Sequence, residues 1–171
     1  MNNKKHTSSS AFTLIELLAS IVVMSIISVT LLPVIGAASD GYASSRAVRS
    51  STERAGFALD RITRIARQAP IGAGDVGVGI TSATSNSIEY SDGSGVQLIG
   101  STLEMLVPGT NPVPLCFDVD SFSVEYYADD GITNTSLTPT LTHRFVFTIA
   151  TQGVELSVLV HPRVWVGQEA P

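Results

Sequence analysis

The chain has 171 residues, of which 44% are apolar and 15% are charged, so it can build one folded domain with a core plus an appended segment, and two large domains are not expected. The net charge of -5 is uneven, because residues 12–67 carry six arginines against four acids, whereas residues 68–171 carry eleven acids against two arginines. An acidic C-terminal part repels phosphate, so direct binding of DNA or RNA by that part is disfavoured.

A long uncharged stretch follows Glu16 near the N-terminus. Residues 17–39 contain no charged side chain, and as a helix rising about 1.5 Å per residue they reach about 35 Å, enough for a bilayer core of about 30 Å. The sequence therefore predicts a membrane helix. Its hydroxyl groups are expected to bond to backbone carbonyls one turn back, at Ser20, Ser25, Ser28 and Thr30.

Two ordinary interpretations of this stretch stay open. In the first it is a cleaved signal peptide, with Lys4 and Lys5 as the basic region and small residues 36–38 before a cut at Ser39. In the second it is a plain membrane anchor, in which Glu16 reaches the interface from near the helix end. The first interpretation leaves Glu16 without a role.

The stretch AFTLIELL, residues 11–18, carries a third interpretation. It resembles the processing site of type IV prepilins and of the pseudopilins of type II secretion. The resemblance implies a leader of residues 1–11, cleavage between Ala11 and Phe12, and Glu16 as the fifth residue of the mature chain. Pro33 then stands at the place where these proteins have a helix-bending proline. Ala11 departs from the family, which prefers glycine before the cut.

The resemblance also implies partners and a role for Glu16. A prepilin peptidase would cut the chain and methylate the new amine of Phe12. In a filament, Glu16 of an incoming subunit would pair with the Phe12 amine of its neighbour, because a carboxylate buried among apolar helices is tolerable only when it is paired. Other pilin or pseudopilin subunits and an inner-membrane assembly platform are the further implied partners.

The next segment, residues 39–69, has a helical pattern that ends at Pro70. Small or apolar residues recur at steps of three and four on one stripe, namely Val48, Ala55, Ala58, Leu59, Ile62, Ile65, Ala66 and Ala69. The opposite face carries Arg46, Arg49, Arg64 and Arg67. We interpret that face as solvated surface, and contact with acidic neighbouring subunits or with DNA is the less favoured alternative.

Residues 71–79 contain Gly72, Gly74 and Gly77 at G-x-G-x-x-G spacing. A dinucleotide site needs a strand before the glycines and a helix after them. Here a helix precedes and strand-like residues follow, so we predict no cofactor. A flexible loop that joins helix to sheet explains the glycines.

From Val76 onwards, β-strand patterns dominate. They predict a hairpin around residues 91–95, a third strand in residues 101–109, further strands in residues 113–131, and a final hairpin around Gln152 and Gly153. One helix followed only by strands predicts an α+β fold, with an antiparallel sheet laid over the apolar stripe of the helix. Heads of pilin-like proteins have this layout.

The predicted organisation of the chain is therefore a leader, two helical halves and a head. The ranges are 1–11 for the leader, 12–38 for the transmembrane and assembly half of the helix, 39–69 for the amphipathic half and 70–171 for the β-sheet head. The ending from Val158 to Pro171 faintly resembles a minor subunit of the mannose-sensitive haemagglutinin pilus. The motif-specific resemblance covers residues 11–33.

No other pattern of catalytic or metal-binding residues stands out. Cys116 is the only cysteine, so no disulfide can form within the chain, and its apolar neighbours predict a buried core thiol. His143 and His161 are expected in strands. Acids that could bind calcium lack EF-hand spacing and are interpreted as turn residues, namely Asp118, Asp120, Asp129 and Asp130. No metal is predicted.

The sequence thus favours a structural protein over an enzyme: a minor pilin or pseudopilin held in the bacterial inner membrane, with its head in the periplasm, and then assembled into a pilus or pseudopilus. The alternative is a secreted or membrane-anchored β-domain, released by ordinary signal peptidase, that acts as a binding module or an enzyme. Adhesion, DNA uptake and type II secretion are not distinguished by the sequence.

Overall fold

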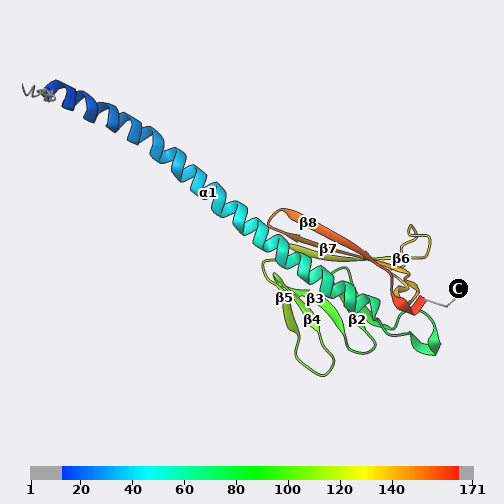
Figure 1. Ribbon diagram of the computed structural model, residues 1–171. Helices are drawn as coiled ribbons and strands as arrows, with labels where there is room; N and C mark the ends of the chain where they lie inside the picture. The colour runs from blue at the N-terminus through cyan, green and yellow to red at the C-terminus, as the bar shows by residue number, and fades with distance from the viewer. Residues whose placement is uncertain (1–12, 166–171) are drawn as a thin grey trace, which may run out of the picture. The chain divides into compact units, whose positions relative to one another are not determined.

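The computed structural model describes residues 13–165, so Ala11 and Phe12, the predicted cleavage site, lie outside the described residues. The fold is α+β, with one long helix, α1 (Leu14–Arg67), followed by strands and short 3₁₀-helices (Figure 1). By its contacts the chain divides into two units, Met1–Arg46 and Ala47–Pro171.

The first unit contains the N-terminal part of α1, and its apolar side chains are exposed. Every large apolar side chain from Leu14 to Ile35 is between 45% and 84% exposed. An apolar surface of this extent needs a cover other than water. By length and composition, α1 is long and apolar enough to cross a membrane.

The second unit contains the rest of α1 and two antiparallel sheets. β1 to β5 form a five-stranded sheet in chain order, and β6, β7 and β8 form a three-stranded sheet. The bounds of the strands are β1 (Ile80–Ala83), β2 (Ser87–Tyr90), β3 (Gly95–Ile99), β4 (Thr102–Leu106), β5 (Val113–Cys116), β6 (Ser121–Tyr127), β7 (Arg144–Thr151) and β8 (Val154–Val160). The 3₁₀-helices are η1 (Ala73–Asp75), η2 (Pro139–Leu141) and η3 (Arg163–Trp165).

The division into two sheets differs from the single sheet that we expected. The chain turns between β5 and β6, where Asp118 has a φ of 58° and Val119 is buried, so β6 leaves the first sheet and pairs with β7. The Val124 N–H donates to the carbonyl of Ser85 at 2.8 Å. This bond ties β6 to the turn between β1 and β2.

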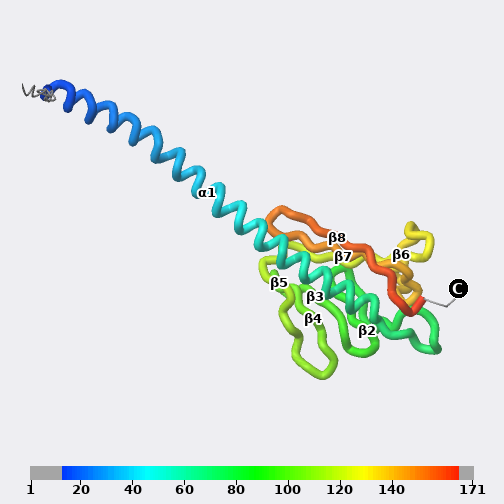
Figure 2. The backbone as a smooth tube through the Cα atoms, in the orientation of Figure 1, coloured from blue at the N-terminus to red at the C-terminus, as the bar shows by residue number. Residues whose placement is uncertain are grey.

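The core of the second unit lies between α1 and the two sheets. In Figure 2 the part of α1 in this unit lies across the strands, with β2 to β5 on one side of it and β7 and β8 on the other. Its buried residues are Ser51, Ala55, Ala58, Leu59, Ile62, Thr63 and Ala66. They share one core with the inward side chains of the strands, including Tyr90, Leu103, Phe145, Phe147 and Ile149.

Most of the predicted stripe of the helix is confirmed, because Ala55 to Ala69 are buried at the expected spacing and only Ile65 and Val48 are half-buried. The final hairpin is also confirmed, and both residues of its turn, Gln152 and Gly153, have positive φ. We expected His143 and His161 to lie in strands, but neither does. His143 immediately precedes β7, and His161 immediately follows β8.

Candidate functional site

Glu16 lies in the first turn of α1 and is held by Thr13, the residue immediately before the helix. Its Oε2 atom accepts hydrogen bonds from the backbone N–H and from the hydroxyl of Thr13, both at 3.0 Å. In return, the Thr13 hydroxyl oxygen accepts from the backbone N–H of Glu16 at 3.4 Å. This reciprocal pair is a capping box, which satisfies N–H groups that have no partner inside the helix.

The capping box gives Glu16 a structural role that the sequence analysis missed. The available signal was the Thr-x-x-Glu spacing from Thr13 to Glu16, which is typical of a helix N-terminus. Among residues 13–165, the other carboxylate oxygen, Oε1, receives no hydrogen bond. Thr13 thus orients the carboxylate of Glu16 through Oε2.

Pro33 lies inside α1, and the helix continues on both sides of it. Because proline has no N–H, the carbonyl of Val29 lacks the partner that it would have in an unbroken ladder. The helix is less stable at this point, because one backbone hydrogen bond is missing. The assembly role that the resemblance implies for Pro33 stays a prediction.

The hydroxyl groups of the apolar segment are directed to backbone carbonyls, as predicted for three of the four residues. Ser20 donates to the carbonyl of Glu16 at 2.8 Å, Ser25 to that of Ile21 at 2.7 Å, and Thr30 to that of Ile27 at 2.9 Å. These bonds satisfy the hydroxyls without water, which is what a helix in lipid requires. No such bond is present for Ser28 in the described part of the chain.

One face of the same segment is hollowed. Its small side chains and the larger ones around them form a shallow groove, lined by Leu17, Ser20, Ile21, Met24, Ser25, Ser28 and Val29. Small residues let the backbones of membrane helices approach closely. The small side chains on this face are Ser20, Ser25 and Ser28.

Asp130 is one of the predicted turn acids of the head. Asp130 lies in the turn after β6, where the Thr133 hydroxyl and the backbone N–H groups of Ile132 and Thr133 donate to its carboxylate. These hydrogen bonds lower the pKa of Asp130 to about 2. Within residues 13–165, no group of three or more His, Cys, Asp and Glu side chains is placed to hold a metal ion.

Cys116 is buried in the core at the end of β5, as predicted. Its thiol lies 3.5 Å from the carbonyl oxygen of Phe117, and burial raises the pKa of the thiol. A buried thiol with a raised pKa is a poor nucleophile.

The glycine-rich segment after α1 joins the helix to the first sheet, as expected, and it is folded into a hydrogen-bonded turn. Gly72 donates to the carbonyl of Gly77 at 2.9 Å, and Gly79 donates to that of Pro70 at 2.8 Å. A Cβ atom on Gly72 would lie 2.3 Å from the carbonyl oxygen of Val76. Tight backbone packing thus explains Gly72 and Gly77, and a positive φ of 75° explains Gly74. The segment leads into β1 instead of a helix.

A polar and aromatic cluster closes the end of the head where β7 begins. The ring of Trp165 stacks on that of His143, and the hydroxyls of Thr135 and Thr142 share a buried hydrogen bond of 2.8 Å. Residues of this cluster come from the loop before β7 and from η3. No pattern in the sequence indicates that these segments, which are distant in the chain, lie next to each other.

No protein-family model and no curated protein matches this chain. The residues at the start of α1 are therefore the basis of the functional conclusion.

Proposed function

We propose that this chain is a prepilin-like structural subunit, cleaved between Ala11 and Phe12 and built into a type IV pilus or a type II secretion pseudopilus. The observation that carries the proposal is the oriented carboxylate of Glu16 at the start of an exposed apolar helix. The capping box alone would serve a plain anchor as well, so the proposal rests on the capping box together with the AFTLIELL stretch and Pro33. A signal peptide is discarded after cleavage and would give Glu16 no role in the mature chain.

The orientation of Glu16 supports pairing with an amine from a neighbouring subunit. Thr13 occupies Oε2, and Oε1 stays open among the described residues. When apolar helices pack side by side, an unpaired carboxylate is costly, whereas a carboxylate paired with the amine of Phe12 is tolerated. The pairing would select one register of the incoming helix.

In this proposal the chain acts without a catalytic site. It enters the bacterial inner membrane through residues 12–38, with its head in the periplasm, and its partners are the prepilin peptidase and methyltransferase, other pilin subunits and the assembly platform. We assign the chain to the minor rather than the major pilins, because Cys116 is its only cysteine. A single cysteine cannot form the head disulfide that is usual in major pilins.

Mass spectrometry of the mature N-terminus tests the proposal. The protein isolated from membranes of its own cells is expected to begin with N-methylated Phe12. An Ala11→Gly variant is the matched control, because it restores the residue that the family prefers, and it should be cut at the same bond and faster. A mature chain that begins at Ser39 would contradict the proposal.

Carbonate extraction of the membranes gives a second test. A chain that keeps residues 12–38 stays in the membrane pellet, since an apolar helix of this length is not displaced by high pH. A secreted β-domain cut before Ser39 would appear in the supernatant, and that result would favour the alternative.

A further inference from the structure

The solvent face of α1 in the second unit carries one large exposed aromatic side chain. Phe57 is 77% exposed, although its neighbours Ala58 and Leu59 on the helix are buried in the core. It makes no aromatic contact within the described residues. Single exposed apolar side chains are common on protein surfaces, and aromatic ones are enriched in interfaces.

Arginines flank Phe57 on the helix surface. Arg54 and Arg61 stand three residues before and four residues after it, so all three side chains lie on one side of the helix. Nearby acids are already engaged, because Glu53 pairs with Arg49 at 2.9 Å and Asp60 pairs with Arg64 at 3.0 Å. In the described part of the chain, neither Arg54 nor Arg61 has an acidic partner within salt-bridge distance. The Arg54 guanidinium donates to the Ser50 carbonyl at 3.3 Å and to the Ser51 hydroxyl at 3.4 Å within the helix.

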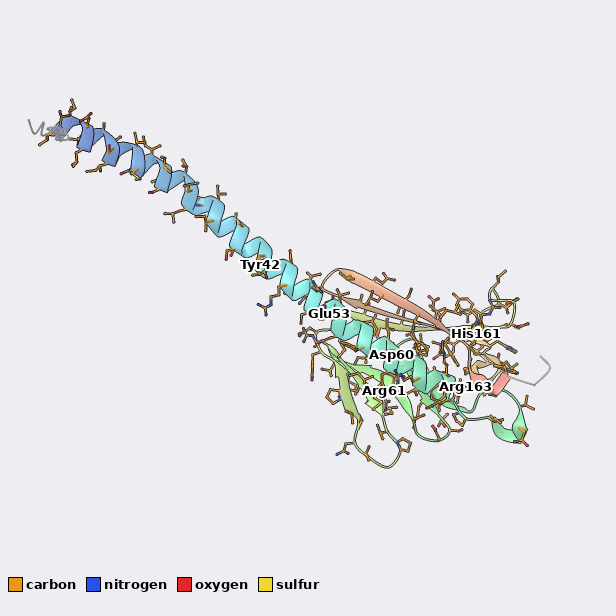
Figure 3. All side chains as sticks on the ribbon, in the orientation of Figure 1. Tyr42, Glu53, Asp60, Arg61, His161 and Arg163 are labelled. Carbon is orange, nitrogen blue, oxygen red and sulfur yellow. The ribbon has the colours of Figure 1, made fainter. Side chains whose placement is uncertain are left out.

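We name Arg54, Phe57 and Arg61 the basic aromatic patch. Figure 3 labels Glu53, Asp60 and Arg61 along this part of α1. Phenylalanine and arginine are both enriched in the centres of protein interfaces. Two copies of this patch cannot face each other, because their arginines would repel. A different surface that carries acidic side chains is therefore the better fit to the patch.

The outer face of the three-stranded sheet carries two glutamates and, near the start of β7, one arginine, Arg144. Glu125 of β6, Val146 of β7 and Leu159 of β8 stand in one row by the strand register. Leu159 is 50% exposed and Val146 is half-buried, so they form an apolar strip. Glu125 is exposed at one end of the row, and Glu155 is exposed further along β8.

The overall charge agrees with this assignment. Residues 47–67 carry five arginines and two acids, whereas residues 68–165 carry ten acids and two arginines. A basic helix face and an acidic body on the same chain are complementary between copies.

We propose that the basic aromatic patch of one copy docks on the outer face of β6, β7 and β8 of a second copy. Phe57 covers the strip of Val146 and Leu159, while Arg54 and Arg61 meet Glu125 and Glu155. The two arginines are about 10 Å apart along the helix. The glutamates are about 10 Å apart across two strand spacings and about 13 Å along the strand, which gives a direct separation of about 16 Å. Long arginine side chains that spread apart can cover the difference of about 6 Å.

The two surfaces cannot meet within one copy. Ala55, Ala58 and Ile62 face the core, so Phe57 points away from the sheets. Phe145, Phe147 and Ile149 of β7 also face the core, so Val146 is on the opposite side of that strand. A contact between two different surfaces of identical chains is heterologous, and it produces a ring or an open filament instead of a closed two-fold dimer.

Photo-crosslinking of the full chain in its native membranes tests the proposal. The photoreactive residue p-benzoylphenylalanine replaces Phe57, and a second, differently tagged copy is co-expressed. We expect a dimer whose crosslinked peptide comes from residues 144–160 of the second copy. The control places the same residue at Phe117, which is 53% exposed at the end of β5, and should give little of this dimer.

A charge exchange provides the matched test of the arginines. The Arg54→Glu/Arg61→Glu variant should lower the yield of the crosslinked dimer about tenfold or more. Adding Glu125→Lys/Glu155→Lys in the second copy should restore it, because opposite charges then face each other again. An Arg67→Glu variant, which changes the same charge outside the patch, should leave the yield unchanged.

Several outcomes would overturn the proposal: crosslinks only to α1 of the second copy, crosslinks only to lipid or to another protein, equal yields at positions 57 and 117, or no rescue by the charge exchange. The proposal does not depend on cleavage before Phe12. A mature chain that begins at Ser39 would therefore overturn the proposed function, whereas these crosslinks could still form.

Discussion

Trp165 stacks on His143, with ring centroids 3.7 Å apart and ring planes that differ by 13°. The indole Nε1 of Trp165 donates to the carbonyl of Thr142 at 2.8 Å, which fixes the indole over the residue that precedes His143. The imidazole is consequently only 12% exposed. The segment after β8 is thus fastened to the start of β7 through one aromatic pair.

Burial in this stack makes the stability of the head depend on pH. Burial lowers the pKa of His143, and although Asp129 at 4.0 Å opposes this effect, Arg144 and His161 add to it. The unfolded chain therefore binds the proton more readily than the folded chain. The contribution of His143 to the free energy of unfolding should be complete above about pH 6.5. It should fall as the pH drops from there towards the lowered pKa of His143 in the folded state.

Urea unfolding of the full chain in detergent measures this effect, with Trp165, the only tryptophan, as the fluorescent probe. A His143→Gln variant should lose this part of the difference in stability between about pH 7.5 and about pH 5.5. A His161→Gln variant is the control, because His161 is exposed and is the smallest of the contributions that lower the pKa of His143, so it should keep most of the pH dependence. If His143→Gln kept the full pH dependence, burial of the imidazole would not be its cause.

Gly77 and Gly74 should differ sharply in their tolerance of alanine. Both have positive φ, 68° and 75°, so alanine at either position costs about 1 kcal/mol from the backbone alone. A Cβ atom on Gly77 would also lie 2.2 Å from the carbonyl oxygen of Thr140, whereas nothing lies within 4 Å at Gly74. Gly77→Ala should therefore destabilise the head by about 3 kcal/mol or more.

The difference between the two alanine variants is the measured quantity, obtained from urea unfolding under identical conditions. Gly56→Ala supplies a further control, because Gly56 lies on the exposed face of α1 with open space around it. That variant should gain about 0.5 to 1 kcal/mol. Equal losses at Gly74 and Gly77 would mean that the contact with Thr140 is not tight in solution.

The helix and the strands were predictable because their signals are local. The stripe from Ala55 to Ala66 has helical spacing, and the turn of Gln152 and Gly153 lies between alternating strands, so neighbouring residues define both elements. The division into two sheets was not predictable. It depends on which strand β6 pairs with. Pairing with β7 instead of β5 is determined by contacts in the folded structure and not by the local sequence.

The candidate site was predictable in part for the same reason. Glu16 was singled out by its place beside an uncharged stretch, but the role of Thr13 as its hydrogen-bond partner was overlooked. The stack of His143 and Trp165 could not be foreseen, since contacts between segments far apart in sequence leave no periodic pattern. The proposed docking surface likewise required the strand register that places Glu125, Val146 and Leu159 in one row.

Cys116 should resist alkylation in the folded protein. Its side chain is 1% exposed, and burial raises the pKa of the thiol, so both access and the thiolate fraction are low near neutral pH. A thiol-specific reagent should label the chain only after denaturation with guanidinium chloride. A Cys116→Ala variant gives the background of the assay. Rapid labelling of the native chain would show that this end of β5 opens in solution.

Substitution of Glu16 should separate its charge from its capping role. Glu16→Gln keeps an oxygen that can accept from the Thr13 N–H, because glutamine also serves in capping boxes, but it removes the negative charge. Glu16→Ala removes both. If pairing with the Phe12 amine drives docking, both variants should be processed normally and both should be incorporated poorly into filaments, with an effect of about tenfold or more.

The measurement is the amount of each variant in sheared filaments relative to the amount in membranes, determined by immunoblotting. A Thr13→Val variant is the matched control, because it removes the hydroxyl of the capping box and keeps the carboxylate. It should weaken the cap by about 1 kcal/mol and leave most of the incorporation intact. Glu16→Gln could instead enter filaments to the same extent as the parent chain while Glu16→Ala fails. That result would mean that Glu16 contributes to assembly through the helix cap and not through its charge.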